Sequence, residues 1–568
     1  MRLVSILFVV ILSVPAWTQV PEPPSRDRVG QALRKAVEFY RTKVSTQGGY
    51  HFSYAEDLSY GRSEHGEGPT QVEVQRQGTP LVGMVYLTAY EATGDQYYLE
   101  AARETAYALL RGQYCSGGWD YTIEFDPAKR QQYPYRVDGA CEGPLAAGNR
   151  VTTLDDNITQ GAARLLLRVD RELRFQDPRI HEAALFALDS LVKAQYPNGA
   201  WPQRYNRFPD PKQLPVKRAA YPESWPRTWP GANFQGHYTF NDNSIVDVID
   251  LMLEATPIYN QPRYKAAAEK GGDFILLAQM PDPQPGWAQQ YDQDMHPAWA
   301  RRFEPPSITG GESQSVMQIL LVLYRETGKK KYLEPLPRAL EYYRRSALPE
   351  TAKPSEHRAR ACPPSTTCMA RFYELKTNRP LYITKGTRAG VRGQSEVIVD
   401  GYQLSYSDES VITHYGVLVN GDRFKTIAAE YQRLVEADPS QLRRPDRLRG
   451  LSPWTEGSNP IGAGETGGRR RRAPGADPAS RVPAILASMD ERGAWVEDGS
   501  MWRADRLVSL FAAKDMVLTL GGQTLHLKEN DTLQVFPGRE EPRQRIIRSQ
   551  TFANHIETLS AYLAAMKR

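Results

Sequence analysis

Apolar residues recur every three or four positions through most of the first 390 residues, as one face of a helix requires. The first such segment begins at Pro80 and stops at Gly94, and Asp95 then begins a second. Pro favours the first helical position, Gly ends helices and Asp caps them. The same pairing returns at residues 158–169 and 180–191, at 244–253 and 264–277, and from 316 onward. The pattern predicts a series of helical hairpins.

A turn that ends in tryptophan follows the predicted hairpins. Residues 113–119 (QYCSGGW) and 195–201 (QYPNGAW) share the pattern Q-x3-G-x-W, a looser version ends at Trp287, and residues 48–50 (GGY) resemble a degenerate first copy. The spacings are similar, with 201 − 119 = 82 and 287 − 201 = 86 residues. Such regularity indicates one unit stacked several times. Gly permits the sharp reversal, and Trp covers the end of the preceding helix.

Stacked helical hairpins form either an open solenoid or a closed α/α toroid. Because each hairpin carries a long polar loop at the same end, we expect a mainly α fold in which repeated αα-hairpins form an α/α toroid-like bundle. The toroid is expected over residues 25–390.

The helical pattern weakens after about residue 380. Apolar runs at 397–399, 417–419 and 516–520, with glycine-rich turns between them, predict short strands. These strands are too few for an independent sheet. We therefore expect residues 391–568 to be a mixed C-terminal extension with short strands, packed on the toroid.

The N-terminus predicts a leader. An apolar run at residues 4–14 follows Arg2, and residues 15–18 resemble a cleavage region, so residues 1–18 are expected to be a secretory signal peptide. An uncleaved membrane anchor is the alternative. No later apolar run is long enough to span a membrane. We expect a secreted or periplasmic monomer, with no membrane span in the mature chain.

The chain has four cysteines. In an oxidising compartment Cys115 with Cys141, and Cys362 with Cys368, is the simplest of three pairings, because each pair closes a local loop. A zinc site is the weaker alternative, since neither pair has C-x2-C spacing.

The charge balance is mildly basic, with a net charge of +5 and a pI near 8.7. This balance suits an anionic partner without proving one. The basic run at 469–472 lies among glycines and prolines at 464–480, which is typical of a flexible surface loop. We therefore expect no nucleic-acid partner.

Three segments are unusually polar where helices are predicted to begin, at residues 151–157, 237–244 and 287–313. Helix capping explains each one singly. In a toroid, however, the starts of inner helices converge on one mouth, which would bring Asp155, Asp242 and Glu312 together. Converging carboxylates repel unless a cation or a substrate group compensates them. Oxygen ligands without His or Cys favour Ca²⁺ or Mg²⁺.

Several of these segments resemble one family. Residues 198–205 (NGAWPQRY) and 237–243 (HYTFNDN) are similar to the G-G-W-P-Q-x-Y and H-I-T-F-N-D-N motifs of the pectic acid lyases, polysaccharide lyase family ten. Further similar segments follow the family's order, at residues 153–156, 287–292, 300–313 and 370–380. The resemblance covers residues 75–390, and these motifs are far more specific than isolated Asp or Trp residues.

The resemblance implies a toroid-like helical fold and cleavage of polygalacturonate by β-elimination, with Ca²⁺ and an arginine base. Its acidic polysaccharide partner would be polygalacturonate or a related uronate polymer. It implies a calcium-and-substrate site at Asp155 and Asp242. Arg301 falls on a substrate-carboxylate arginine, where a guanidinium binds a carboxylate with two hydrogen bonds, and we expect it to be catalytic together with Arg388. The remaining expected substrate-binding residues are Lys385, Asp156, Trp201 and Glu312.

The chain departs from the family where the arginine base is expected. The family's R-R-x-G-Y-x-W stretch has its nearest counterpart at residues 412–417, without the Arg pair or the Trp. Asp156 also stands where the family usually has Asn. Either the base has moved, to Arg388 in preference to Arg392 or to His414, or the chain binds uronates without cleaving them.

A third alternative is a triterpene-cyclase-like α/α barrel, because such barrels share the Q-x3-G-x-W turn. Those enzymes need an acidic D-x-D-D donor, which this chain lacks. The predicted leader also favours a polymer outside the cell. A shared packing turn says little about chemistry.

Overall fold

We analysed a computed structural model of the chain. It describes residues 23–139, 141, 151–210, 215–231, 233–351, 354–384, 388–390, 396–399, 402–409, 411–412, 415–438, 442, 478–501, 508–511, 515–520, 523–527, 532–536 and 544–566. The predicted signal peptide at 1–18, the Arg469–Arg472 run and most of the predicted loop at 464–480 lie outside these residues.

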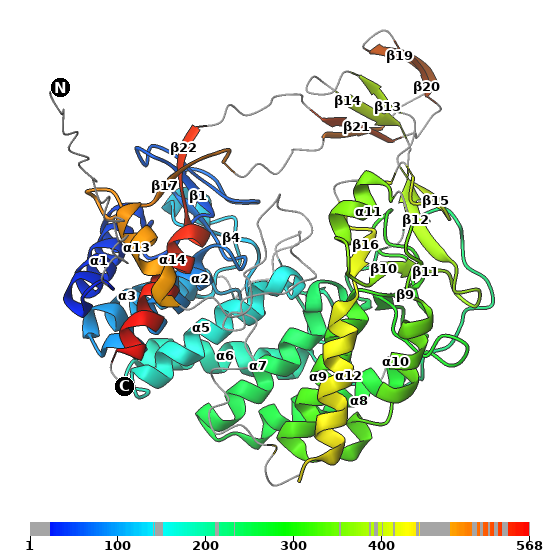
Figure 1. Ribbon diagram of the computed structural model, residues 1–568, viewed down its shortest axis with the longest axis horizontal. Coiled ribbons are helices and arrows are strands. Elements are labelled where there is room, and N and C mark those ends of the chain that lie inside the picture. Colours follow the sequence, from blue (N-terminus) through cyan, green and yellow to red (C-terminus); the bar gives the residue numbers. More distant parts are fainter. Residues whose placement is uncertain are drawn as a thin grey trace, which may run out of the picture.

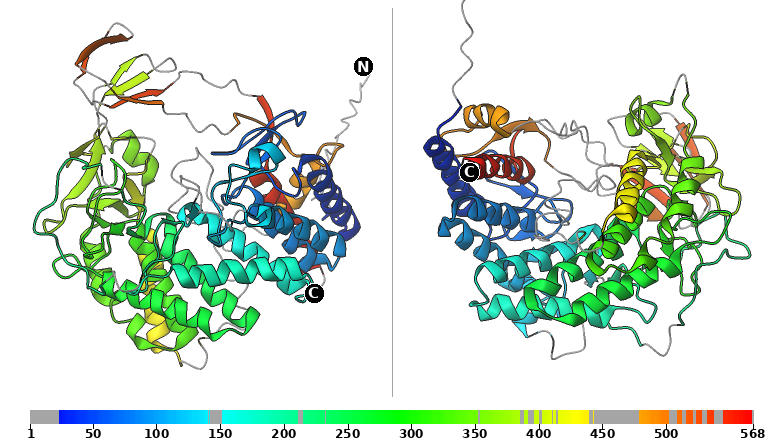
Figure 2. Two further views of the ribbon diagram at one scale, coloured as in Figure 1. Left: turned by 180° about the vertical axis from the view of Figure 1, so that it is seen from behind. Right: turned by 60° about the horizontal axis from the view of Figure 1, so that its bottom comes forward.

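The main body is a curved double row of helices (Figure 1). Consecutive helices pair as hairpins: α2 (Thr79–Thr93) with α3 (Gln96–Arg111), α5 (Ile158–Glu172) with α6 (Pro178–Ala194), and α7 (Ser244–Tyr259) with α8 (Pro262–Ala278), followed by α9 (Glu312–Thr327) and α10 (Leu336–Arg345). Helices α2, α5, α7 and α9 contact one another in series, and α3, α6 and α8 form the second row. The right-hand view of Figure 2 shows the rows bending into an arc. The predicted mainly α, toroid-like fold of repeated αα-hairpins is confirmed.

The tryptophan turns hold successive hairpins together. Each indole is fully buried and donates its Nε1 hydrogen to a carbonyl near the end of the preceding helix: Trp119 to Leu109 at 2.7 Å, Trp201 to Leu191 at 2.8 Å and Trp287 to Ile275 at 2.9 Å. The turn glutamine bridges units, since Gln113 donates both to Gly117 of its own turn and to Ala183 of α6. The predicted repeat is therefore a packing device between units.

The structure contains a further copy of the turn near the C-terminus. Trp495 donates to the carbonyl of Ile485 at 2.9 Å, and Gly493 has φ +96°, as Gly199 has φ +97°. This copy was not predicted, because Met489 stands where the turns that end at Trp119 and Trp201 have Gln.

This C-terminal turn belongs to the helix row. It follows α13 (Pro478–Ala487) and precedes α14 (Ser549–Ala565), which packs on α2, α13 and α1 (Arg26–Phe39). Helix α14 therefore lies beside α1, so helices from the first and the last part of the sequence share one unit (Figure 1). A four-stranded sheet in the order β17 (Val496–Gly499), β22 (Gln544–Arg548), β1 (Ser53–Ala55), β2 (Gly61–Arg62) joins the same two ends.

Short antiparallel strands connect neighbouring loops at one end of the hairpins. They are β3 (Gln71–Glu73) with β4 (Thr122–Glu124), β5 (Thr152–Thr153) with β6 (Arg204–Tyr205), β7 (Tyr238–Thr239) with β8 (Gln290–Tyr291), and β10 (Cys368–Ala370) with β16 (Leu418–Asn420). A sheet in the order β15 (Gln403–Ser405), β12 (Pro380–Thr384), β11 (Phe372–Tyr373), β9 (Ile308–Thr309) continues the series. These pairings fix the loops that carry the polar segments.

The C-terminal strands also form a sheet of their own, in the order β13 (Arg388–Gly390), β14 (Glu396–Val399), β21 (Thr532–Phe536), β18 (Val508–Phe511), beside the hairpin of β19 (Met516–Leu520) and β20 (Gln523–Leu527). Strands were predicted at β14, β16 and β19 but not at β13, β18 or β21, and the expectation that the strands are too few for an independent sheet is wrong. Strands distant in sequence supply the missing partners.

The remaining elements are short helices and one longer one: η1 (Tyr40–Val44), α4 (Pro127–Arg130), η2 (Arg136–Asp138), η4 (Asp155–Asn157), η6 (Asn241–Asn243), η7 (Lys330–Tyr332), α11 (Glu356–Ala361) and α12 (Asp422–Glu436). Disulfides join Cys115 to Cys141 and Cys362 to Cys368, which confirms the predicted pairing. Among the described residues, every helix is too short or too polar to cross a membrane.

Candidate functional site

Two equivalent tight turns open the inner helices α5 and α7. In η4, Asp156 and Asn157 have φ +51° and +60°, and in η6, Asp242 and Asn243 have φ +47° and +61°. Left-handed backbone at two consecutive residues other than glycine costs free energy, and such strain is typical of functional sites. Strand pairs anchor each turn, with β5 on β6 and β7 on β8. The repeat thus builds the same strained turn twice, side by side.

The two turns bring three carboxylates together. Asp155, Asp156 and Asp242 each offer an oxygen, and these oxygens lie within 4.8 Å of one another. Burial, together with the charge of Asp242, raises the pKa of Asp155 to about 7. Burial and the neighbouring aspartates also raise the pKa of Asp156 well above its ordinary value. The cluster (Asp155, Asp156 and Asp242, hereafter the acidic cluster) therefore needs a positive partner to stay fully charged.

Oxygen atoms without hydrogen-bond partners also indicate that the two turns could hold a cation. Asp155 Oδ1, Asn157 Oδ1 and Asn243 Oδ1 are buried and accept no hydrogen bond. The amide of Asn157 is oriented from behind, because its Nδ2 donates to Asp247 Oδ2. Buried polar atoms without partners are rare in folded proteins. A set of carboxylate and amide oxygens fits a hard cation such as Ca²⁺.

A buried arginine lies beside the acidic cluster. Arg371, between β10 and β11, pairs with Glu312 at the start of α9, Nη2 to Oε1 at 2.6 Å, and both side chains are almost fully buried. The same Nη2 donates to Asn241 Oδ1 at 3.2 Å, within the turn that carries Asp242. Burial opposes the charge of Arg371, but Glu312 and other neighbouring groups raise its pKa above the ordinary arginine value. This residue was not predicted as a site residue, although it lies within the family-like run at 370–380.

A second arginine approaches from the loop after Trp287. Arg301 donates from Nε and Nη2 to the two carboxylate oxygens of Glu304, at 2.9 and 2.7 Å. Glu304 also accepts from Tyr415 Oη at 2.8 Å, and its carboxyl is buried. Although burial alone would raise the pKa of Glu304, Arg301 lowers it to about 2. The Arg301 side chain keeps 39% of its surface exposed, which leaves room for a ligand.

Tyr415 links the two arginines. Its ring lies 4.1 Å from the guanidinium carbon of Arg371 and 5.3 Å from that of Arg301. This residue belongs to the segment 412–417, the predicted counterpart of the family's base motif. The segment therefore contributes a tyrosine to the site, where the family's motif would contribute arginine.

A third arginine also lies beside the acidic cluster. Arg204 of β6 donates from Nη2 to Tyr121 Oη at 3.1 Å and lies 4.0 Å from Asp155 Oδ2. Tyr121 Oη is 3.5 Å from Asp155 Oδ2 and 3.4 Å from Asp156 Oδ2. His65 stacks on the Tyr121 ring, with centroids 3.7 Å apart.

The other predicted site residues fall elsewhere. Trp201 is fully buried and packs in a turn, and Glu312 is 1% exposed and pairs with Arg371, so neither side chain is open to a ligand in this structure. Arg388 lies in β13, paired with Ile398 in the C-terminal sheet. Lys385, Arg392 and His414 lie outside the described residues.

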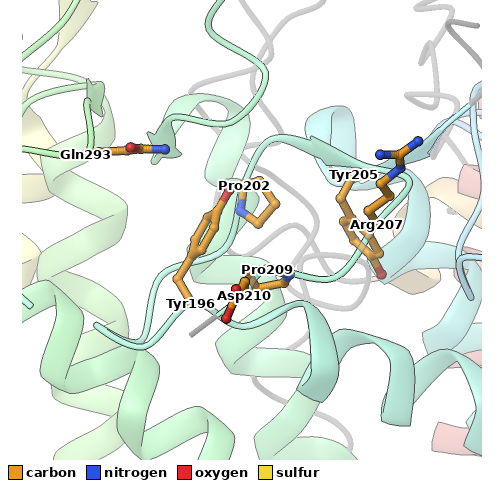
Figure 3. Close-up of a pocket in the computed structure, with 7 residues that line it drawn as sticks. All are labelled: Tyr196, Pro202, Tyr205, Arg207, Pro209, Asp210 and Gln293. Carbon is orange, nitrogen blue, oxygen red and sulfur yellow. The ribbon is translucent and has the colours of Figure 1, made fainter. Parts of the chain in front are cut away.

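A separate pocket of about 220 Å³ opens on the loop after Trp201 (Figure 3). It is lined by Tyr196, Pro202, Tyr205, Arg207, Pro209, Asp210 and Gln293. Tyr205 follows Arg204 in β6, and successive side chains of a strand point to opposite faces. The pocket therefore lies across the strand from the acidic cluster and shares none of its residues.

Comparisons with known proteins bear on this site. Residues 128–395 match the family model described as pectic acid lyase. A segment with the family's sequence thus contains the acidic cluster, Arg301 and Arg371, whereas His65 and Tyr121 precede it. No curated protein gives a sequence match.

Solved structures show weak likeness. A variant family 10 polysaccharide lyase from Cellvibrio cellulosa in complex with trigalacturonic acid is 20% identical, covering 62% of this chain and 98% of its own, with a TM-score of 0.40. A second structure of the Cellvibrio cellulosa lyase is 22% identical, covering 52% and 82%, with a TM-score of 0.35. An α-mannanase from Bacteroides thetaiotaomicron is 8% identical, covering 96% and 97%, with a TM-score of 0.37. Scores this low add nothing to the argument below.

Proposed function

We propose that this chain, a relative of the pectic acid lyases over residues 128–395, is a secreted lyase that cleaves polygalacturonate or a similar uronate polymer by β-elimination. The observation that carries the proposal is the acidic cluster flanked by charged arginines. Carboxylates gathered in this way attract a cation, and arginines beside them attract the carboxylates of a polymer. One site then holds both the cation and the anionic chain.

The residues that would hold the cation are Asp155, Asp156 and Asp242, with the unpartnered amide oxygens of Asn157 and Asn243 in the same two turns. A bound Ca²⁺ would neutralise the uronate carboxylate and so stabilise the negative charge that develops when the adjacent C5 proton is removed. The leaving group is the oxygen on C4, and the product gains a double bond between C4 and C5.

Arg301 and Arg371 serve binding in this proposal. Each is paired with a buried glutamate, and each has a pKa above the ordinary arginine value, because the paired carboxylate outweighs the burial that opposes the charge. A guanidinium held in its charged form is a poor proton acceptor. Arg301, which is partly exposed, would hold a uronate carboxylate, and Arg371 would fix the η6 turn through Asn241.

The proton acceptor would come from another segment. Arg388 remains our first choice and Arg392 our second, since both follow directly after the family-like run at 370–380. The pairing of Arg301 and Arg371 also supports a second candidate function, in which the chain binds uronates and does not cleave them.

The test is the ultraviolet absorbance of unsaturated product from polygalacturonate, with Ca²⁺ and with a chelator. A lyase produces Ca²⁺-dependent absorbance, and Asp242→Asn abolishes it. Arg388→Ala and Arg392→Ala then identify the base, because only the variant that lacks it is inactive. If wild type binds polygalacturonate and releases no unsaturated product, the binding function replaces the lyase. Absence of both activities overturns both.

A further inference from the structure

The arginine on the N-terminal side of the acidic cluster differs from the other two in its pairing. Arg301 and Arg371 each form a close ion pair, with Glu304 and Glu312. Within the described part of the chain, the nearest carboxylate to Arg204 is Asp155, at 4.0 Å. This salt bridge is longer than those of Arg301 and Arg371, which measure 2.7 and 2.6 Å, and the Arg204 side chain is 25% exposed. An arginine in this state retains the capacity to bind a carboxylate.

Arg204 is held in place from two sides. Tyr121 accepts its Nη2 hydrogen, and the guanidinium carbon lies 5.4 Å from the centre of the same ring. His65 covers the ring, at an interplanar angle of 26°. The side chains of His65, Tyr121 and Arg204 thus form a continuous stack that reaches Asp155 and Asp156.

The loop that carries His65 is also held in place by hydrogen bonds. Glu73 is fully buried and accepts backbone hydrogens from His65 at 3.2 Å and from Gly66 at 3.0 Å, so it fixes the loop that carries His65. His65 Nδ1 lies 3.7 Å from Glu73 Oε1. A buried carboxylate is costly unless hydrogen bonds or ion pairs satisfy it, and the two backbone donors of this loop supply such bonds. Glu73 thus fixes the position of the His65 side chain, and with it the stack next to the acidic cluster.

We propose that Arg204, positioned by Tyr121 and His65, binds the carboxylate of a second uronate residue of the same polymer chain. This inference rests on the proposed function. Arg204 lies beside Asp155, the three aspartates lie within 4.8 Å of one another, and Arg371 donates to Asn241 in the turn that carries Asp242. A polymer with a carboxylate on every residue would meet the cation at one residue and Arg204 at another. The position selects free uronates over methyl esters, because an ester offers no anion to a guanidinium.

Isothermal titration with di-, tri- and tetragalacturonate, in Ca²⁺, tests the inference with three variants. Arg204→Ala removes a charged hydrogen bond, so affinity for the longer oligomers falls by on the order of ten- to hundredfold. The shortest oligomer that reaches only the cation and Arg301 loses little. Arg204→Lys keeps the charge without the fork and gives an intermediate loss. Arg207→Ala is the matched control, since it removes an exposed arginine three residues along, outside this site, and affinity stays at the wild-type value.

Two further measurements separate the inference from its rivals. Arg204→Ala does not weaken Ca²⁺ binding without sugar, because it removes a positive charge near the acidic cluster. A loss of Ca²⁺ affinity parallel to the loss of oligomer affinity would instead mean that Arg204 only shapes the cation site, and would overturn the inference. Equal affinity of Arg204→Ala and wild type for all oligomers would also overturn it, leaving the proposed function intact. No uronate binding by wild type would mean that the proposed function itself has failed.

Discussion

The acidic cluster makes a prediction whose sign depends on calcium. Asp242→Asn removes one of three carboxylates whose oxygens lie within 4.8 Å. At this separation two unit charges repel by about 3 kcal/mol at an effective dielectric constant of about 20. The charge of Asp242 is also the second cause, after burial, of the raised pKa of Asp155, which is about 7. Without calcium, and above pH 7 where Asp155 is charged, the variant should therefore be more stable than wild type by up to about 3 kcal/mol.

The expected change in melting temperature is small but measurable. With an unfolding entropy of about 2 cal/mol/K per residue, a chain of this size shifts by roughly 1 °C per kcal/mol, so the variant should melt about 2–3 °C higher in chelator at pH 8. Calcium at about 100 times its Kd adds about 2.7 kcal/mol to wild type. The variant has lost a ligand and should gain much less.

Differential scanning calorimetry with chelator and with calcium checks both arms. Asp57→Asn is the control, because Asp57 is an exposed carboxylate whose described partner is Ser59, two residues later. Its melting temperature should stay close to wild type and respond to calcium as wild type does. The reasoning is refuted if Asp242→Asn melts below wild type in chelator, or if calcium stabilises the variant as much as wild type.

Two other predictions concern the ion pair at the site and the joined chain ends. Arg301 lowers the pKa of Glu304 from 4.5 to about 2. The pair therefore contributes stability that is fully present above pH 4.5 and is lost as pH falls toward 2. The pKa difference of about 2.5 corresponds to about 3 kcal/mol. In Arg301→Ala this acid-sensitive part of the stability should disappear, as urea unfolding at a series of pH values would show, whereas an unchanged pH profile contradicts the assignment. Gly493→Ala should destabilise far more than Gly94→Ala: both have positive φ, but the added Cβ at Gly493 lies 2.7 Å from a backbone oxygen of α1 and that at Gly94 meets nothing within 4 Å. Equal losses in thermal unfolding would mean that the contact between the chain ends carries no stability.

Local patterns in the sequence determined the helical hairpins, their caps and the turns between them. Pro80, Gly94 and Asp95 begin or end helices as predicted, because capping depends on residues within one turn. The repeat of the Trp turns was also visible, since each copy needs the same glycine and indole. The converging Asp155 and Asp242 follow from the repeat, because equivalent helix starts in stacked units lie side by side.

Contacts between distant segments decided the rest. Glu312 was predicted to meet substrate, but Arg371, 59 residues later, encloses it in a buried ion pair. The position of the Arg204 side chain depends on its hydrogen bond to Tyr121, 83 residues earlier. Helix α14 joins α1 from the other end of the chain, with Tyr562 donating to the carbonyl of Pro24 at 2.9 Å. Hydrophobic periodicity predicts which face of a helix is buried, but it does not predict which other segment packs against that face. Pairing of charges and completion of the helix row are therefore properties of the tertiary structure.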